Sequence, residues 1–261
     1  MDLGITGKTA LVLGGGGGLG SAVCEQLARE GVQVAAADIS VEALAVTAEK
    51  LEAIGSRHMT LTWNLADIAS TEAHLAAIAS ELGPIDILFN NTGGPAPSPA
   101  YAFDENVLSD QFRSMVMSVM SITSQVLPGM RERRWGRIIT SASSGVVAPI
   151  PNLSVSNALR LSLVGWSKTL AREVAADGVT VNVVVPGRIG TQRTTFLDEA
   201  KAKRENSTAQ AVAAESRAGI PANRYGTPQE YANAVAFLAS AGASYITGTQ
   251  LRVDGGLLGN I

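Results

Sequence analysis

Short apolar segments alternate with amphipathic segments along almost the entire chain, and this alternation limits the possible folds more than any other feature. Helical spacing of apolar residues begins at Leu19 and continues through Ala22, Val23 and Leu27. The apolar segments that have the length of buried strands are residues 9–13, 32–38, 85–91, 136–143 and 179–187. Strands of this kind, separated by helices, predict a parallel sheet that is covered on both faces.

The helix ends are also marked in the sequence. Between two predicted strands, Ser40 has the character of an N-cap and Gly55 stands just past the end of the helical pattern. No repeat, low-complexity tract or linker interrupts the alternation. We therefore expect one α/β domain over residues 1–261, built as a doubly wound, Rossmann-like parallel sheet with helices on both faces.

Composition narrows the function classes. The 261 residues are 46% hydrophobic with a net charge of −3, which favours a large core and gives no basic surplus for nucleic acid. Cys24 stands alone, so we expect a buried thiol, and His58 and His74 belong to no ligand-spaced cluster, so no metal is expected. The chain begins without a signal-peptide pattern and lacks an apolar run of membrane-spanning length. We expect a cytoplasmic protein that acts on a small molecule.

A run of glycines follows the first predicted strand, in LVLGGGGGLGSAV. Glycine lets the backbone turn sharply and approach a ligand closely. The helix that follows offers free N–H groups and the positive end of its dipole. The run therefore predicts a pyrophosphate site for a dinucleotide, whose contacts would be Gly14, Gly16, Gly17, Gly18 and Leu19.

An acidic residue ends the next predicted strand. Asp38 follows Gly18 by twenty residues, which is the spacing of a carboxylate that accepts hydrogen bonds from an adenosine ribose diol. A carboxylate there would repel a 2′-phosphate, and Gly17, Ile39 and Ser40 supply no cation to bind one. The sequence predicts NAD in preference to NADP. A strand that merely ends in a solvated aspartate is the alternative.

With these features in place, the chain resembles the short-chain dehydrogenase/reductase family over nearly its whole length. The family's first loop matches LGGGGGLG from Leu13, with its threonine replaced, and its Asn-Asn-Ala-Gly turn matches NNTG at 90–93. The strand GRIITSASS ends in serines, as in the family, and a Pro-Gly pair follows the next strand. The C-terminal run RYGTPQEYANAVAFLAS…YITGTQLRVDGG is especially specific.

The resemblance implies where a nicotinamide dinucleotide would lie. It would cross the carboxyl ends of the strands, with its nicotinamide near the Pro-Gly pair. Members of the family are commonly tetramers, so a homotetramer is expected. The further cofactor contacts implied by the resemblance are Asn64, Leu65, Asn91, Thr92, Gly93, Pro186, Gly187, Ile189 and Thr191.

The catalytic positions depart from the family. Its serine is matched by Ser143, but its tyrosine is matched by Ser156, its lysine by Arg160 and its asparagine by Met115. In the family, the tyrosine exchanges the hydroxyl proton, and the lysine binds the nicotinamide ribose and lowers the pKa of the tyrosine. The resemblance therefore assigns Ser143, Ser156 and Arg160 to a catalytic site that has lost its usual proton donor.

Serine cannot replace tyrosine directly. A phenol has a pKa near 10, whereas a serine hydroxyl is a far weaker acid. Its oxygen lies about 2.4 Å from Cα, against about 6.5 Å for tyrosine, which leaves a gap of about 4 Å. Arg160 keeps its charge and could bind the ribose as a cofactor contact, or it could instead face solvent or pair with a carboxylate. Both interpretations of Arg160 stay open.

Three routes would restore proton transfer. A water could be held by Ser143, Ser156 and Arg160, a tyrosine such as Tyr101 or Tyr225 could reach the site, or the substrate could need no strong acid. The sequence does not choose among these routes.

The segment from about residue 191 to 221 departs from the strand–helix rhythm. It is polar, rich in charge and alanine, and follows the carboxyl end of a predicted strand. We expect a lid insertion over the site, with an ordinary surface insertion as the alternative.

Three functions fit these observations. The first is an oxidoreductase that transfers hydride between NAD(P)(H) and a carbonyl or secondary alcohol. The second is a non-catalytic nucleotide-binding sensor or scaffold, and the third is a lyase-type relative. Arg188 and Arg193 flank the expected nicotinamide end, where they could meet an anionic substrate, a cofactor phosphate or solvent. The substrate and the direction of the reaction stay open.

Overall fold

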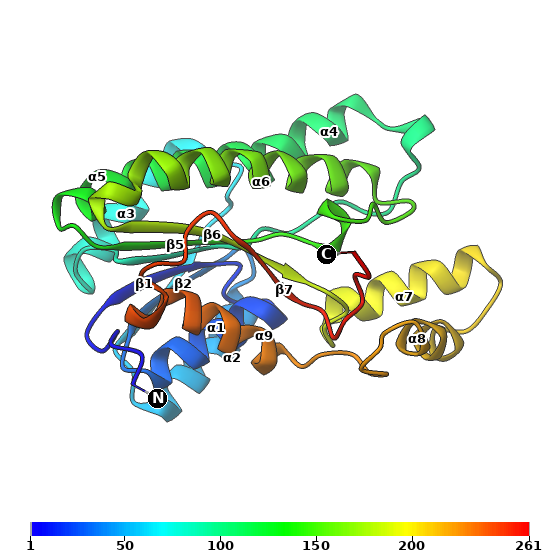
Figure 1. Cartoon of the computed structure of the whole chain (residues 1–261), viewed down its shortest axis with the longest axis horizontal. Coiled ribbons are helices and arrows are strands. Elements are labelled where there is room, and N and C mark those ends of the chain that lie inside the picture. The colour runs from blue at the N-terminus through cyan, green and yellow to red at the C-terminus, as the bar shows by residue number, and fades with distance from the viewer. Residues whose placement is uncertain (1, 261) are drawn as a thin grey trace.

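The central strands of the sheet are buried along almost their whole length, as expected where helices cover both faces. The computed structural model describes residues 2–260, and its sheet is parallel throughout, with the strand order β3-β2-β1-β4-β5-β6-β7 (Figure 1). The strands are β1 (Thr9–Leu13), β2 (Gln33–Asp38), β3 (His58–Thr62), β4 (Ile87–Asn90), β5 (Gly136–Ser141), β6 (Val179–Pro186) and β7 (Gln250–Val253).

Helices pack on the two faces in separate groups (Figure 1). On one face, α1, α2 and α9 bury apolar side chains against β1, β2 and β4, while α3, α5 and α6 cover the other face. The doubly wound fold predicted from the sequence is confirmed. The helices are α1 (Gly18–Arg29), α2 (Val41–Ile54), α3 (Thr71–Glu81), α4 (Glu105–Phe112), α5 (Ser118–Glu132), α6 (Ser154–Val174), α7 (Gln192–Arg204), α8 (Ala209–Ala218) and α9 (Pro228–Ala239).

Local signals agree with the structure at several points. The Ser40 hydroxyl accepts a hydrogen bond from the Ala43 amide at the start of α2, and Gly55 ends the helix with φ of 76°. Cys24 is fully buried and its burial raises the pKa of the thiol. The predicted helix ends and the inert cysteine are confirmed.

The strand order reverses beside β1, and this reversal locates the site. The chain moves from β1 to β2 and β3 on one side, then returns to place β4 on the other side of β1. The connections at the carboxyl ends of β1 and β4 therefore separate, which opens a crevice for a ligand.

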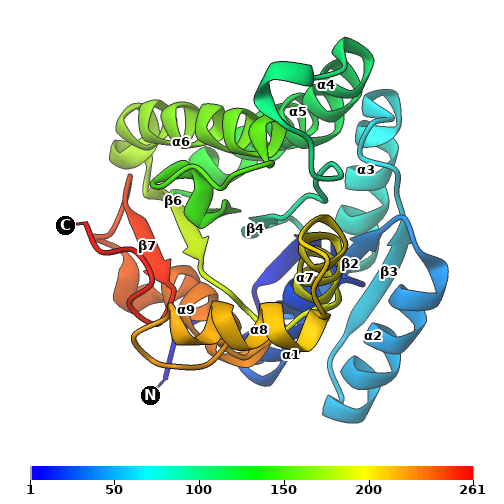
Figure 2. The same ribbon diagram turned by 90° about the vertical axis from the view of Figure 1, so that its right-hand side faces the viewer.

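Helices α7 and α8 lie beyond the carboxyl ends of the strands. Figure 1 shows both helices extending past the sheet, and Figure 2 shows them in front of it. They form the segment for which the sequence predicted an insertion. None of the helices within residues 2–260 combines the length and the apolar content that crossing a bilayer requires.

Candidate active site

A cavity of about 1060 Å³ occupies the crevice at the carboxyl ends of the strands. It runs from Asp38 at the end of β2, past the glycine loop, to Ser143 after β5 and to the first turns of α6. With the exception of Gly16, every site residue predicted from the sequence lines this cavity. Its size is typical of a pocket for a cofactor and a small substrate.

At several positions, the glycine loop leaves no room for a side chain. Gly14 has φ of 65°, and a Cβ there would stand 2.5 Å from Asn91 Nδ2. A Cβ on Gly20 would overlap the Gly14 carbonyl, so α1 packs directly on the loop. The N-cap of α1 is Gly17, which has no side chain to occupy the first N–H groups of the helix. The loop therefore presents main-chain donors and a positive dipole end to the cavity, which is what a pyrophosphate needs.

Asp38 is held in place by main-chain donors. Its carboxylate accepts hydrogen bonds of 3.1 Å from the Gly16 amide and 3.1 Å from the Ser40 amide. Gly16 therefore supports Asp38 through its amide and does not itself line the cavity. Within residues 2–260, no lysine or arginine forms an ion pair with Asp38. The remaining acceptor capacity of the carboxylate faces the cavity, where a ribose diol could use it.

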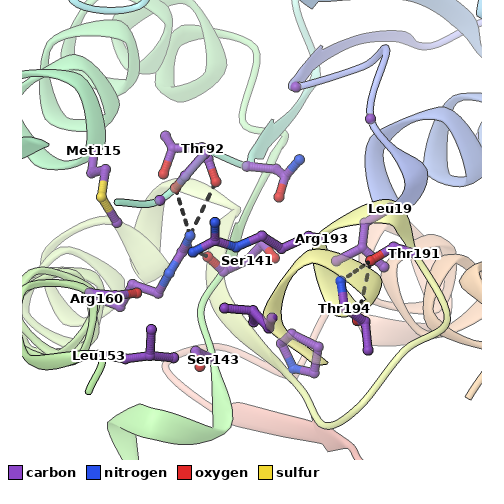
Figure 3. Close-up of a pocket in the computed structure, with 18 of the residues that line it drawn as sticks. Leu19, Thr92, Met115, Ser141, Ser143, Leu153, Arg160, Thr191, Arg193 and Thr194 are labelled. Carbon is purple, nitrogen blue, oxygen red and sulfur yellow. Dashed lines mark hydrogen bonds between the residues drawn. The ribbon is translucent and has the colours of Figure 1, made fainter. Parts of the chain in front are cut away.

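The hydroxyl of Ser143, which follows β5, remains available as a hydrogen-bond donor. Ser143 Oγ accepts a hydrogen bond of 3.1 Å from the Gly145 amide, which fixes the side chain and leaves its own O–H able to donate. Ser156 lies in the first turn of α6 and is buried. Arg160 follows one helical turn later and therefore projects from the same side of α6. Figure 3 shows Ser143 and Arg160 at one end of the cavity.

The Arg160 guanidinium binds main-chain carbonyls. Its Nη2 donates to the carbonyl oxygens of Gly93 (2.8 Å) and Thr92 (3.2 Å), and its Nη1 donates to that of Ser141 (3.2 Å). Burial, and then the nearby charge of Arg193, lower its pKa to about 10, so it remains protonated at neutral pH. The alternative in which Arg160 faces solvent or pairs with a carboxylate is wrong, because these three carbonyls hold the side chain at the cavity.

Two guanidinium groups converge beside Ser156. A Cβ built on Gly94 would lie 3.5 Å from Arg160 Nη2, 3.5 Å from Arg193 Nη2 and 3.9 Å from Ser156 Oγ. Figure 3 shows Arg193 reaching across the cavity from α7 toward Arg160, on the side away from Leu19. Arg188, the other cation that the sequence placed here, instead pairs with Asp198 at 3.5 Å.

The asparagine position of the family holds an apolar side chain. Met115 is buried, lines the cavity and lies in a single π-helical turn, Arg113–Met117, between α4 and α5. Such turns are frequent at functional sites. A thioether cannot donate a hydrogen bond, so this position cannot order a water as an amide would.

The tyrosines suggested as substitutes lie elsewhere. Tyr101 is 93% exposed, and the Tyr225 hydroxyl donates to Asp198. Neither lines the cavity. The sequence interpretation missed Tyr231, which is fully buried on α9 and donates a 2.8 Å hydrogen bond to Ser141 Oγ. Its position on the apolar face of a predicted helix gave no signal beyond that of a core residue.

Helix α7 forms one wall of the cavity. Its residues Leu197, Lys201 and Arg204 line the cavity together with Arg193. The lid interpretation remains a prediction that this placement favours.

Comparisons with known proteins agree with this geometry. A family model described as Enoyl-(Acyl carrier protein) reductase matches residues 14–258. The 3-oxoacyl-(acyl-carrier-protein) reductase FabG of Escherichia coli is 39% identical over 257 residues, with 96% of this chain and 97% of the relative covered. Nodulation protein G of Azospirillum brasilense is 37% identical over 251 residues, with 96% and 98% covered.

Solved structures extend the likeness. L-sorbose reductase from Gluconobacter frateurii, complexed with NADPH and L-sorbose, aligns with a TM-score of 0.93 at 30% identity over 100% of both chains. NAD+-bound xylitol dehydrogenase aligns with a TM-score of 0.91 at 27% identity, covering 97% of this chain and 99% of that one. The ordered motifs, the cavity and these relatives agree, and the chain belongs to the short-chain dehydrogenase/reductase family.

Proposed function

We propose that the protein is an oxidoreductase that transfers hydride between NAD(H) and a carbonyl or secondary alcohol, using a proton donor other than tyrosine. One observation carries the proposal: a single cavity joins Asp38, the glycine loop and the Ser143 hydroxyl. The names of the relatives, which are reductases and a dehydrogenase, support this interpretation over a sensor or a lyase.

The residues around the cavity fit a nicotinamide dinucleotide. The glycine loop has no room for side chains at Gly14 and Gly20 and presents main-chain N–H groups, as a pyrophosphate requires. Asn64 and Leu65 would contact the adenine, Asn91, Thr92 and Gly93 would line the path of the cofactor, and the nicotinamide would be bound by Pro186, Gly187, Ile189 and Thr191. When bound there, the nicotinamide supplies or accepts the hydride.

Asp38 favours NAD over NADP in this proposal. Its carboxylate is held by two main-chain amides and faces the cavity without a cationic partner among the described residues. A ribose diol can donate to it, whereas a 2′-phosphate would be repelled.

Proton transfer is assigned to a water held by Ser143, Ser156 and Arg160. The Ser143 O–H is free to donate, and Arg160 uses three of its five N–H donors on carbonyls, so two remain. A positioned acid or base contributes about 10²–10⁴-fold to a rate, and the positioning of reactants contributes as much or more. The loss of tyrosine therefore slows turnover without abolishing it.

The charge of Arg160 has a second use. A protonated guanidinium at the same end of the cavity as Ser143 would stabilise negative charge that develops on the substrate oxygen during reduction. The same side chain could contact the nicotinamide ribose through one of its two remaining donors, which leaves the other for the water.

The proposal extends to three further points. Helices α7 and α8 would act as a lid, because α7 lines the cavity and both helices lie beyond the strand ends. The family resemblance favours a homotetramer that works in the cytoplasm, which light scattering and cell fractionation would test.

Isotope transfer tests the proposed chemistry at low turnover. The purified protein is incubated with NADH that carries deuterium at C4 and with ketones of several sizes, and mass spectrometry detects deuterium in the alcohol. Calorimetric titrations with NADH and NADPH measure cofactor binding in parallel. We expect tighter binding of NADH and deuterium in at least one product. Binding of NADH without deuterium transfer to any ketone would replace this proposal with the sensor function.

A further inference from the structure

The cations around the cavity fall into two groups. Three of them have acidic partners: Arg188 pairs with Asp198, Lys201 with Glu215, and Arg204 with Glu205. Arg160 and Arg193 form no ion pair with any residue between 2 and 260, and both donate to main-chain carbonyls. The unpaired cations are therefore concentrated at one end of the cavity.

The two unpaired guanidinium groups lie close together beside Gly94. Their Nη2 atoms each lie 3.5 Å from the position of a Cβ on Gly94, so they stand no more than about 7 Å apart, twice that distance. Ser156 Oγ lies 3.9 Å from the same position. Burial lowers the pKa of both arginines, and the charge of Arg193 lowers that of Arg160 further. Two cations held this close repel each other, and an anion between them would remove the repulsion.

A cofactor phosphate is the less favourable anion for this place. The pyrophosphate site lies at the N-terminus of α1, beside Leu19 and Thr191. Figure 3 shows the Arg193 side chain directed away from Leu19 and toward Arg160. The two arginines thus meet at the end of the cavity that holds Ser143 and Ser156, where the substrate would stand.

We propose that Arg160 and Arg193 bind a carboxylate of the substrate, so that the protein acts on an oxo acid or on the corresponding hydroxy acid. This inference rests on the proposed oxidoreductase function. A guanidinium offers a planar pair of N–H donors that matches a carboxylate, and Arg193, which donates only to the Pro95 carbonyl, keeps such a pair. Both Nη2 hydrogens of Arg160 are bound by Thr92 and Gly93, so Arg160 contributes mainly its charge. Ser156 contributes a hydroxyl to the same site, in the space vacated by the family's tyrosine.

A pair of isosteric ligands tests this inference without turnover. Butyrate and butyramide have the same carbon skeleton and differ in charge, and calorimetry measures the binding of each to the protein with and without NADH. We expect butyrate to bind at least about tenfold more tightly than butyramide. Arg193→Gln should reduce butyrate affinity by about 10- to 100-fold, and Arg193→Lys, which keeps the charge without the fork, should lie between.

Arg217→Gln is the matched control for lost charge. Arg217 lies on α8, packs its guanidinium 5.8 Å from the Tyr225 ring centre and does not line the cavity. Butyrate should bind this variant as it binds the wild type. Arg160→Gln gives a second measurement if the variant melts cooperatively. If it does not, Arg193→Gln alone carries the test, because Arg193 donates to a single carbonyl and its loss leaves few groups without partners.

The outcomes separate this inference from the proposed function. Equal binding of butyrate and butyramide would overturn the carboxylate site. A fall in NADH affinity in Arg193→Gln with unchanged butyrate affinity would assign the arginine to a cofactor phosphate and also overturn it. Deuterium transfer is measured independently, so a failure of hydride transfer leaves the butyrate result standing as an anion site.

Discussion

The two ends of the cavity differ in whether the main chain or side chains supply the groups that would contact a ligand. At the proposed nucleotide end, around the glycine loop and Asp38, the contacts would come from main-chain N–H groups and from one carboxylate that main-chain amides hold. At the substrate end, the family's chemistry depends on four side chains, and Met115, Ser156 and Arg160 replace three of them. A site built from main-chain N–H groups tolerates side-chain substitutions as long as the backbone conformation is kept. A proton relay depends on the pKa and reach of individual side chains, so a few substitutions remove it.

The structure also shows what the replacement residues do. Arg160 closes the substrate end by joining the turn after β4 to the end of β5 through three carbonyls. A lysine has no fork with which to bridge these groups in one plane. The proposed substrate end therefore holds a fixed cation and no phenol at the matched position.

The largest expected effect comes from restoring the family's tyrosine and lysine at positions 156 and 160. Ser156→Tyr combined with Arg160→Lys restores a phenol of the right reach and a cation that lowers its pKa. If the nucleotide end is intact, turnover should rise by about 10²–10⁴-fold, and each single change should do less because the two residues act together. NADH consumption with uncharged ketones measures the effect, because the double change also alters the proposed carboxylate site.

Ser156→Phe combined with Arg160→Lys is the matched control. It adds the same ring volume without the hydroxyl, so its turnover should stay at the wild-type level. Equal rates in the Tyr and Phe versions would show that the phenol is not the missing part, and the contrast between the two ends would lose its chemical basis.

Removing the charge of Asp38 tests the nucleotide end of the cavity. Asp38→Asn keeps the shape but loses the charge, and hydrogen bonds to a charged group contribute about 1.5–3 kcal/mol. NADH affinity should fall by about 10- to 150-fold, and NADPH affinity should rise because the repulsion of its 2′-phosphate disappears.

Asp67→Asn removes the same charge from an exposed position outside the cavity and should change neither affinity. Titration calorimetry with both cofactors measures the pair. A parallel loss of NADH and NADPH affinity in Asp38→Asn would mean that the carboxylate supports the loop rather than the ribose.

A third test addresses the main-chain construction of the loop. In Gly20→Ala, the new methyl group would overlap the Gly14 carbonyl, and overpacking of this kind costs about 1–3 kcal/mol. The free energy of unfolding and the NADH affinity should both fall. Gly165→Ala places a methyl group in open space on α6 and should raise stability by about 0.5–1 kcal/mol. Urea unfolding that ranks the two variants in the opposite order would contradict this account of the loop.

The sequence predicted the buried strands well because a strand that is covered on both faces consists mostly of consecutive apolar residues. The central strands β1, β2, β4, β5 and β6 appear as apolar runs, and their positions are confirmed within a few residues. The edge strands β3 and β7 are partly exposed and carry mixed residues, so no run marked them. The π-helical turn at Arg113–Met117 was also missed, because a single inserted residue shifts the helical register once and produces no period of its own in the sequence.

At the site, the sequence placed the residues but not their partners. Spacing and resemblance brought Asp38, Ser143, Ser156 and Arg160 to one cavity. The three carbonyls that hold Arg160 could not be predicted, because main-chain acceptors have no sequence signature. The convergence of Arg193 on Gly94 likewise depends on how α7 sits over the strand ends, which is a tertiary property.

The smallest predicted effect concerns Tyr231, a buried residue that hydrogen-bonds to Ser141 beside the substrate end of the cavity. Tyr231 donates to Ser141 Oγ from the core, while the Ser141 carbonyl accepts from Arg160, so Ser141 links the core to the cavity. Burial raises the pKa of Tyr231, which keeps the phenol neutral and makes it a structural donor. Tyr231→Phe should lower the free energy of unfolding by about 1 kcal/mol, as expected for one lost hydrogen bond, and should leave NADH affinity within about twofold. Tyr245→Phe, at a fully exposed position, should change neither quantity. If Tyr231→Phe instead reduced deuterium transfer by 100-fold or more at unchanged stability, Tyr231 would belong to a proton path through Ser141. The substrate end would then have a phenol as its proton donor, placed on α9 instead of α6, and the contrast with the nucleotide end would no longer rest on a missing donor.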